Sequence, residues 1–276
     1  MTTSSEDSRL FVQSFATGLS VLDAFNAERR EMSLPEIASA AGISKSAAQR
    51  FAHTLEALGM LTKDPASKRY ALSSRTLDLG YRYLQSHALL ERASPYLLEL
   101  NRRSGETVNL GEPAGLEMVY IGRFPSPLRS IVHMPIGRRL PMYTASAGRA
   151  YLSGLPEHDA RAILEASDRV KFTPRTVTAI EPLMEMLAQA REQGYAYSNE
   201  EYYRGDLALA VPVHDVSQRV VAAVNVSVST SDWTLASAID QFVPLMLDTA
   251  RLISTTPPSL QALSPFRIGF AGMTPL

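Results

Sequence analysis

The sequence predicts an α+β protein with two domains: an N-terminal winged helix-turn-helix domain and, beyond a linker helix, a larger domain of mixed helices and strands. Three observations support this prediction. The chain has 276 residues, of which 45% are hydrophobic, which is enough for two buried cores. Its first quarter places helical and hairpin patterns in one defined order. The remainder alternates strand-like and helix-like runs.

The N-terminal domain is expected over residues 10–74, after a polar stretch at 1–9 that we expect to be disordered. Apolar residues recur at helical spacing through 11–25, which predicts an amphipathic first helix. A second, shorter helix is predicted to begin after Ser33, because Ser33 and Glu36 have the Ser-x-x-Glu spacing of a capping box.

A turn and a third helix follow. Gly42 suits the positive φ at the end of a helix, and Ser44 is the natural cap of the next one. Gly59 is expected to end that helix. Beyond it, two strand-like runs flank an Asp-Pro-Ala-Ser turn at 64–67, which predicts a hairpin. Helix, helix, turn, helix and basic hairpin is the order of a winged helix-turn-helix.

The third helix has an apolar face and a polar face. The residues expected to be buried are Ala48, Phe51, Leu55 and Leu58. The residues on the polar face are Ser46, Gln49, Arg50 and His53. A polar stripe of this kind is often only solvated surface, and Arg50 could instead be held in an ion pair with Glu56 or Asp64.

The Gly-x-Ser-Lys-Ser run that starts at Gly42 also suggests a phosphate-binding loop. A P-loop requires Gly-x-x-x-x-Gly-Lys-Ser/Thr after a buried strand. Here Ser44 precedes Lys45, Ser39 stands at the position of the first glycine, and the preceding segment is predicted to be helical. The motif lacks both glycines, which excludes a nucleotide cradle.

The charge distribution favours DNA as the anion instead. A formal net charge of -1 excludes binding of nucleic acid by bulk positive charge, so such binding must use a local patch. Between Ser44 and Arg75, six basic residues stand against two acidic ones. The expected contacts are Ser44, Lys45 and Ser46 to phosphate, Gln49, Arg50 and His53 to base edges, and Lys63, Lys68 and Arg69 from the wing.

We expect the linker helix over 75–91, the second domain over 92–255 and a poorly ordered tail over 256–276, which Pro and Gly punctuate. The second domain opens with a helix that ends at Gly105. Its expected strands are 107–113, 116–123, 129–134, 207–215 and 219–229, and its expected helices lie near 145–153, 157–166, 181–193 and 236–253.

Several kinds of chemistry are excluded by composition. The chain has no cysteine, which removes disulfides, a thiol nucleophile and thiolate metal sites, and its five histidines have no metal-ligand spacing. We therefore expect no metal and no cofactor. No run of about 18 apolar residues occurs, and the polar N-terminus has no signal-peptide pattern. We expect a soluble, cytoplasmic protein with no membrane partner.

The segment "YTASAG", residues 143–148, suggests an anion-binding helix start. Small residues and hydroxyls would leave backbone N–H groups free for a carboxylate, and Arg138, Arg139 or Arg149 could add positive charge. Two alternatives stay open. The small residues could merely allow close helix packing, and Arg149 could pair with a glutamate of "NEE", residues 199–201.

With these motifs in place, the chain resembles the IclR family of bacterial transcriptional regulators over residues 14 to 255. The N-terminal resemblance lies in "GLSVLDAF", "LPEIASAAGISKSAAQRFAHTLEALGML" and "YALSSRTLDLGYRYL". The C-terminal resemblance lies in "IGRRLPMYTASAGRAYLSGLP", "QGYAYSNEEYYRGDLALAVPVHD" and "VVAAVNVSVS". It implies that the second domain is a GAF-like effector-binding domain with a small-molecule pocket.

The resemblance also implies which residues line that pocket. They are Met142, Thr144, Ala145, Gly148, Arg149, Ala150, Ser198, Ala208, Asn225 and Ser227. The chain departs from the family where Ser198 and Asn199 replace an acidic pair, Ala208 stands in place of a cysteine found in some members, and Asn225 replaces a frequent serine. The segments "RLPMYTASAGR" and "AAVNVSV" look closest to the branch that controls aromatic-acid catabolism through the β-ketoadipate route.

The expected function is a DNA-binding regulator, a homodimer or tetramer on operator DNA, controlled by a small carboxylate. The apolar first helix and the linker helix are candidate dimer surfaces. One rival is an enzyme acting on a small acid, with Asp206, His214 and Asp215 as the nearest candidates, although His214 and Asp215 should face opposite sides of a strand. Another rival is a ligand-sensing scaffold that does not bind DNA.

Overall fold

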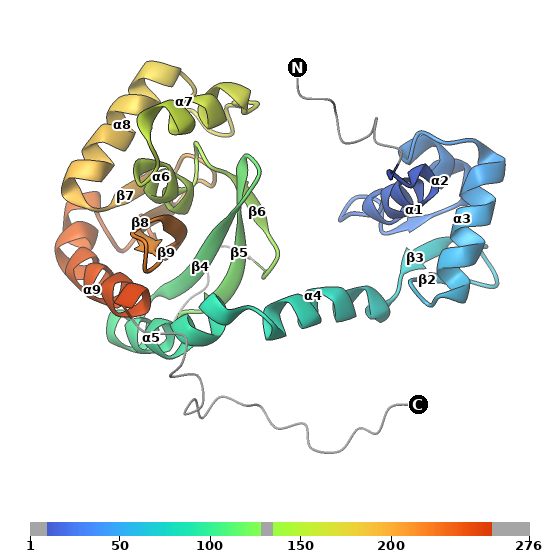
Figure 1. Cartoon of the computed structure of the whole chain (residues 1–276), viewed down its shortest axis with the longest axis horizontal. Coiled ribbons are helices and arrows are strands. Elements are labelled where there is room, and N and C mark those ends of the chain that lie inside the picture. Colours follow the sequence, from blue (N-terminus) through green and yellow to red (C-terminus); the bar gives the residue numbers. More distant parts are fainter. Residues whose placement is uncertain (1–9, 128–134, 256–276) are drawn as a thin grey trace, which may run out of the picture. The chain divides into compact units, whose positions relative to one another are not determined.

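The computed structural model describes residues 10–127 and 135–255, and these form two compact units divided between Gln85 and Ser86 (Figure 1). Three expectations lie outside the described residues: the disordered N-terminus at 1–9, the strand at 129–134 and the tail at 256–276. Because each unit has its own hydrophobic core, each is described by itself.

The winged helix-turn-helix part of the N-terminal unit combines three α-helices with a small antiparallel sheet (Figure 1). The helices are α1 (Gln13–Asp23), α2 (Leu34–Ala40) and α3 (Lys45–Ala57). The strands are β1 (Glu31–Met32), β2 (Leu61–Lys63) and β3 (Tyr70–Leu72), in the order β1-β3-β2. The predicted winged helix-turn-helix is confirmed, and the two-residue β1, too short to give a strand pattern, is an addition to it.

The predicted helix boundaries are set by local hydrogen bonds. Ser33 donates its backbone N–H to the Glu36 carboxylate at 2.7 Å, which is the acidic half of the expected capping box. The Ser44 hydroxyl accepts the N–H of Ala47 at 3.2 Å and so caps α3. Gly42 has a φ of 65°, the left-handed value that the turn before α3 requires.

The core of this unit lies between the helices and the sheet. It includes Val21, Phe25, Ile37, Ala48, Ala52, Leu55, Leu61 and Tyr70. One expectation needs correction. Leu58, expected on the buried face of α3, is 56% exposed because it is the residue at the helix C-cap. On α1, the residue that is buried in the core is Val21, and Phe15 and Leu19 are exposed.

The single linker helix expected over 75–91 is wrong. The structure has a 3-10 helix, η2 (Ser74–Thr76), followed by α4 (Leu77–Gln85), and a separate helix α5 (Ala88–Ser104) begins after a break. The break has a local cause, because His87 caps α5 by accepting the N–H of Leu90 at 3.2 Å. α5 ends at Gly105, as predicted, with a φ of 71°.

The C-terminal unit is built on a six-stranded antiparallel sheet in the order β6-β5-β4-β9-β8-β7. The strands are β4 (Thr107–Ala114), β5 (Glu117–Phe124), β6 (Arg139–Pro141), β7 (Ala196–Asn199), β8 (Asp206–His214) and β9 (Val220–Ser229). The helices after α5 are α6 (Ser146–Ser153), α7 (Glu157–Ala166), α8 (Ile180–Gln193) and α9 (Leu235–Thr255). Short strands β6 and β7 were not predicted.

Helices cover both faces of this sheet (Figure 1). α5 and α9 pack together and contact β4 and β8. α6 contacts β8 and β9 from the other side and carries α7 and α8 on its outer surface. The central strands are therefore buried on both faces, which explains the nearly continuous apolar run of β8 and of the first half of β9, whereas β9 alternates valine with polar residues from Asn225 on.

Candidate functional sites

The polar face of α3 is open to solvent. The predicted residues Ser44, Lys45, Ser46, Gln49, Arg50 and His53 are all exposed. The opposite face holds the helix in the core through Ala48, Ala52 and Leu55. Within the described residues Arg50 has no ion pair, so the alternative in which Glu56 or Asp64 holds it is not what the structure contains. Its guanidinium is free to contact an external partner.

The predicted wing contributes two exposed cations. The ammonium group of Lys63 lies 5.1 Å from the centroid of the Tyr70 ring. Lys68 directly follows the turn and has a φ of 58°. The turn is held by Asp64, whose carboxylate accepts the N–H of Ala66 at 2.9 Å. Both lysines therefore project from an ordered hairpin.

Arg69 differs from the other predicted DNA contacts because its guanidinium already has partners within the domain, and its contact with DNA stays a prediction. Its guanidinium donates to the Glu36 carboxylate at 2.9 Å and to the carbonyl of Glu31 at 2.8 Å. Hydrogen bonds from Ser33, together with Arg69, hold the pKa of Glu36 at about 2. Arg69 thus ties β3 to the start of α2. Sequence alone could not show this because its partners lie 33 and 38 residues away.

The second site is a cavity of about 140 Å³ between the sheet and α6. Cross-strand register builds its wall. Ser198 on β7 pairs with Ala208, Ala208 with Ser227 and Ser227 with Thr107, so one row of side chains crosses four strands. A neighbouring row contains Asn109 and its partner Asn225. All of these residues line the cavity.

The start of α6 closes one side of the cavity and is uncapped. Ala145 occupies the cap position and, in the described structure, supplies no side-chain acceptor for the first-turn N–H groups. Two buried atoms that line the same space, Ser146 Oγ and Asn225 Oδ1, find no hydrogen-bond partner among the described residues. Buried polar groups are rarely left unpaired, so this arrangement is suited to a polar ligand.

The cavity includes part of the predicted set and omits the rest. The predicted residues that line it are Thr144, Ala145, Ser198, Ala208, Asn225 and Ser227. The predicted residues absent from its described lining are Met142, Gly148, Arg149 and Ala150. Only the first turn of α6 faces the cavity, because the rest of the helix packs between β8 and α8.

Gly148 has a packing role. A Cβ at this position would lie 2.4 Å from the Cα of Met142, which is far inside van der Waals contact. The alternative in which small residues allow close packing is therefore correct for Gly148. The close approach fixes the segment before α6 and so fixes the uncapped helix start.

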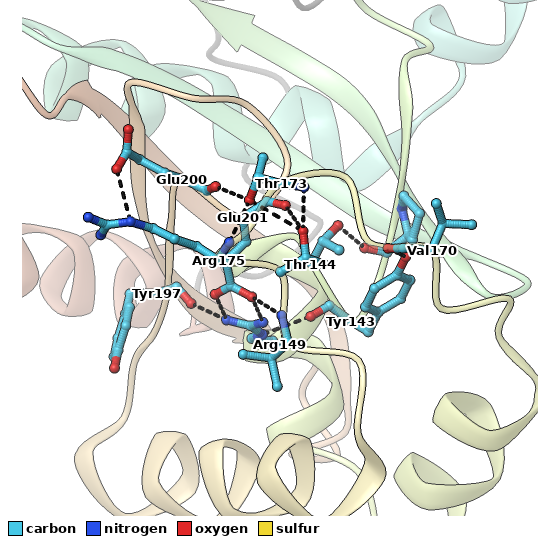
Figure 2. Close-up of polar contacts among 12 residues, drawn as sticks. Tyr143, Thr144, Arg149, Val170, Thr173, Arg175, Tyr197, Glu200 and Glu201 are labelled. Atoms are coloured by element: carbon cyan, nitrogen blue, oxygen red, sulfur yellow. Dashed lines mark hydrogen bonds and ion pairs between the residues drawn. The ribbon is translucent and has the colours of Figure 1, made fainter.

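Arg149 is buried behind the cavity and pairs with Glu201 (Figure 2). Its two terminal nitrogens each donate to a Glu201 oxygen at 2.5 Å, and its Nε donates to the carbonyl of Tyr143 at 2.9 Å. Of the two roles considered for Arg149, the structure has the ion pair with a glutamate of "NEE". The pair anchors the segment between β7 and β8 to α6.

Glu201 extends this network to the segment between α7 and α8 (Figure 2). Its carbonyl accepts from Thr176 Oγ1 at 2.6 Å, and its carboxylate accepts the N–H of Val177 at 3.2 Å. The carbonyl of neighbouring Glu200 accepts from Thr173 Oγ1 at 2.7 Å. Behind the cavity, three segments distant in sequence are thus held by one buried polar cluster.

Charged groups also line the cavity. Asp206 accepts a hydrogen bond from Ser227 Oγ at 2.6 Å, and burial raises the pKa of its carboxyl to about 6. Arg123 donates to Asn109 Oδ1 at 3.1 Å, and burial lowers the pKa of its guanidinium. Burial also raises the pKa of the Tyr120 phenol. The lining therefore combines an acceptor, a cation and hydroxyl groups.

Aromatic side chains form another part of the lining. Tyr202 and Tyr203 lie edge to face, with ring centroids 4.7 Å apart, and Arg138 donates to both phenol oxygens at 3.3 Å. Arg138, one of the three arginines considered as an extra charge for an anion, thus has phenol partners. Trp233 adds a further ring to the lining.

Several lining residues were not predicted: Asn109, Tyr120, Arg123, Ser146, Tyr202, Tyr203 and Trp233. For Asn109 a signal existed, because a polar residue in the middle of an otherwise buried strand needs a partner. The aromatic residues carried no such signal, since a Tyr or Trp in a loop is common on any surface.

The arrangement does not favour the enzyme considered above. Asp206 begins β8 and His214 ends it, so they lie about 26 Å apart along a strand that rises roughly 3.3 Å per residue. Asp215 accepts from the Arg219 guanidinium at 2.8 Å. The three candidate residues are therefore not brought together as an acid–base group.

Comparison with known proteins identifies the family. A model of the IclR helix-turn-helix domain matches residues 16–65, and a model described as bacterial transcriptional regulator IclR C-terminal matches residues 81–255. The chain belongs to the IclR family. Its members in these comparisons are DNA-binding transcriptional regulators, and the family is not enzymatic.

Two curated IclR-family relatives span most of the chain. The HTH-type transcriptional regulator XynR of Escherichia coli (strain K12) is 36% identical over 80% of this chain and 87% of its own length. The Pca regulon regulatory protein of Pseudomonas putida is 34% identical over 87% of this chain and 82% of its own. The helix-turn-helix domain of the present chain therefore belongs to a DNA-binding regulator, whose partner is operator DNA.

Solved structures of IclR proteins share the fold. The regulator from Alicyclobacillus acidocaldarius superposes with a TM-score of 0.77 at 28% identity, covering 88% of this chain and 98% of its own. An IclR homologue from Microbacterium hydrocarbonoxydans in complex with 4-hydroxybenzoate gives 0.73 at 23% identity, with 88% and 98% covered. Within the described residues, no helix is long and apolar enough to cross a membrane.

Proposed function

We propose that this IclR-family regulator binds a small carboxylic acid, with a single ring or of similar size, in the cavity beside α6, and that this binding controls its affinity for operator DNA. The observation that carries the proposal is the uncapped start of α6 beside the unpaired buried atoms Ser146 Oγ and Asn225 Oδ1. Free N–H groups and the positive end of a helix dipole are suited to a carboxylate.

The cavity size limits the ligand. Its volume of about 140 Å³ is close to that of a cavity of roughly 150 Å³ that holds benzene in another protein. The rings of Tyr120 and Tyr202 and the small side chain of Ala208 provide apolar surface for a flat ligand body. An aromatic acid agrees with the similarity to the Pca regulon regulatory protein and with the 4-hydroxybenzoate bound by the more distant homologue.

On the DNA side, we propose that Ser44, Lys45 and Ser46 contact phosphate at the start of α3 and that Gln49, Arg50 and His53 face base edges. Their shared exposure on one face of α3 supports this. Lys63 and Lys68 would extend the contact from the wing. One recognition helix reads few bases, so the chain is proposed to act as a dimer or a tetramer.

The test is a thermal-shift screen of aromatic and aliphatic carboxylates against the full chain, followed by DNA-binding assays with its own upstream DNA. A ligand that binds the folded state raises the melting temperature, and a true effector must also change the DNA affinity. A stabilising acid that leaves the DNA affinity unchanged would contradict effector control. If no carboxylate raises the melting temperature and none changes the DNA affinity, the proposed ligand class is contradicted.

A further inference from the structure

Asp206 is the cavity carboxylate whose position is fixed by the sheet. It begins β8 two residues before Ala208, so both side chains face the cavity. Ser227 Oγ donates to one of its oxygens at 2.6 Å. Among the described residues, no other hydrogen bond or ion pair of Asp206 occurs, so its second oxygen accepts nothing from the protein. That oxygen is available to a ligand.

The surroundings of Asp206 supply little compensation for its charge. Arg123, the neighbouring cation of the cavity, donates to Asn109. The Tyr120 phenol interacts electrostatically with Asp206, and the other carboxylates that line the cavity are those of Glu106 and Asp232. Burial makes its carboxyl harder to ionise, with a pKa of about 6, yet at neutral pH the ionised form still predominates. A buried carboxylate of this kind gains most from a hydrogen-bond donor.

The distance from Asp206 to Asn225 matches a small substituted ring. Asn225, one of the unpaired groups, pairs with Ala210 across the sheet. Asp206 lies four residues farther along the same strand, which is about 13 Å between Cα atoms. Because the side chains of Asn225 and Asp206 both reach into the cavity, the remaining span accommodates one ring with substituents at two positions.

We propose that the effector carries a hydroxyl group in addition to its carboxylate and that Asp206, supported by Ser227, selects hydroxylated acids by accepting a hydrogen bond from that hydroxyl. This inference rests on the proposed carboxylate site and adds a second recognition point to it. It makes Asp206 a specificity-determining residue. An acid of the same size with no donor would leave the buried carboxylate unpaired and bind more weakly.

The test is isothermal titration calorimetry on the full-length chain at neutral pH with benzoate, 3-hydroxybenzoate, 4-hydroxybenzoate and 4-methoxybenzoate. We expect at least one hydroxybenzoate to bind 10-fold or more tighter than benzoate and 4-methoxybenzoate. In Asp206→Asn this preference should fall at least 10-fold, because benzoate no longer leaves a buried carboxylate unpaired and should bind at least as tightly as it binds the wild-type protein. Asp215→Asn, at the other end of β8 and held by Arg219, is the control and should keep the preference.

The outcomes separate this inference from the proposed function. Binding of benzoate and both hydroxybenzoates with equal affinity would overturn the role of Asp206 and leave the carboxylate site intact. An equal loss for all four acids in Asp206→Asn would show a structural role only, and would also overturn it. If none of the acids binds wild-type protein, while the protein still binds its DNA, the carboxylate site and the inference built on it both fail.

Discussion

At the scale of single residues, Gly148 and Asp206 shape the cavity in different ways. Gly148 contributes by having no Cβ, which lets the backbone of Met142 pass against α6. Asp206 contributes one oxygen that the protein does not use. In each case a residue outside the local sequence pattern determines the role: Met142 for Gly148 and Ser227 for Asp206.

The substitution Gly148→Ala is expected to destabilise the protein. The new Cβ would lie 2.4 Å from Met142 Cα, which is backbone that cannot move without shifting the start of α6. Overpacking of this kind costs roughly 1–3 kcal/mol. Chemical denaturation should show the loss. Gly80→Ala in α4 is the matched control, since no described atom lies within 4 Å of its Cβ position, and it should leave stability unchanged or raise it.

Asp206 should make stability depend on pH. Its folded pKa is about 6 against an ordinary value of 3.8, so the folded state binds its proton more tightly than the unfolded state does. The contribution of Asp206 to the free energy of unfolding, measured against Asp206→Asn, is therefore fully present below about pH 4 and is lost as the pH rises through 6. The loss is at most about 3 kcal/mol, at roughly 1.4 kcal/mol per pH unit. Parallel melting profiles of the two proteins from pH 4 to 7.5 would contradict this.

At the scale of elements, α3 has one face buried in the core and one face exposed to solvent. The wing carries both an exposed cation and an ion-paired one. Lys68 is exposed at the turn, whereas Arg69 is bound to Glu36 and to the carbonyl of Glu31. Adjacent basic residues on one hairpin therefore have different surroundings. We expect the exposed Lys68 to contribute more to DNA binding than Arg69, whose guanidinium already has partners in the domain.

Substitutions in α3 and the wing should separate these roles. We expect Arg50→Ala to lower operator affinity by roughly 1–3 kcal/mol and to relax base preference. Lys45→Ala should weaken binding to all sequences and reduce the slope of affinity against salt concentration by about one ion. Arg69→Ala should mainly lower the melting temperature. Electrophoretic mobility shifts at several salt concentrations measure the DNA effects. A reduced salt slope in Arg69→Ala with unchanged melting would reverse its assignment.

The elements also show what could be predicted from sequence. Ser44 and Gly42 act within four residues of themselves, so local spacing was sufficient to place α3. The break at His87 was missed because apolar spacing continues through it. β7 was missed because four residues give too short a pattern. The cavity residues were partly found through family resemblance, but Arg149 and Gly148 were assigned to the lining because their partners, Glu201 and Met142, meet them only through tertiary packing.

At the scale of the whole molecule, the N-terminal unit exposes more apolar surface than a free monomer needs. Phe15 and Leu19 lie one turn apart on α1 and are 68% and 45% exposed. On α4, Leu77 and Tyr81, also one turn apart, are 72% and 60% exposed. Large exposed apolar residues that share one face of a helix indicate an interaction surface. These are the first helix and the linker segment that the sequence suggested for self-association.

We expect the double substitution Phe15→Glu and Leu19→Glu to weaken self-association and with it operator binding. Two buried charges per subunit would oppose contact between copies. The sedimentation coefficient should shift toward that of the monomer. DNA affinity should fall because a monomer carries one DNA-binding domain where an oligomer links two. Val216→Glu, an 80% exposed apolar residue in the turn between β8 and β9, is the control. An unchanged oligomer in the double variant would place the interface elsewhere.

The connection between α5 and β4 has a mechanical consequence. α5 is a rod of 17 residues, about 25 Å long. Its C-terminus at Gly105 is two residues before Thr107, which lines the cavity, and its first residue, Ala88, is three residues after the end of α4. Along the chain, α5 therefore joins a strand that lines the cavity to the segment that leads into the DNA-binding domain, and we expect a shift of β4 by a bound molecule to act on that segment through α5.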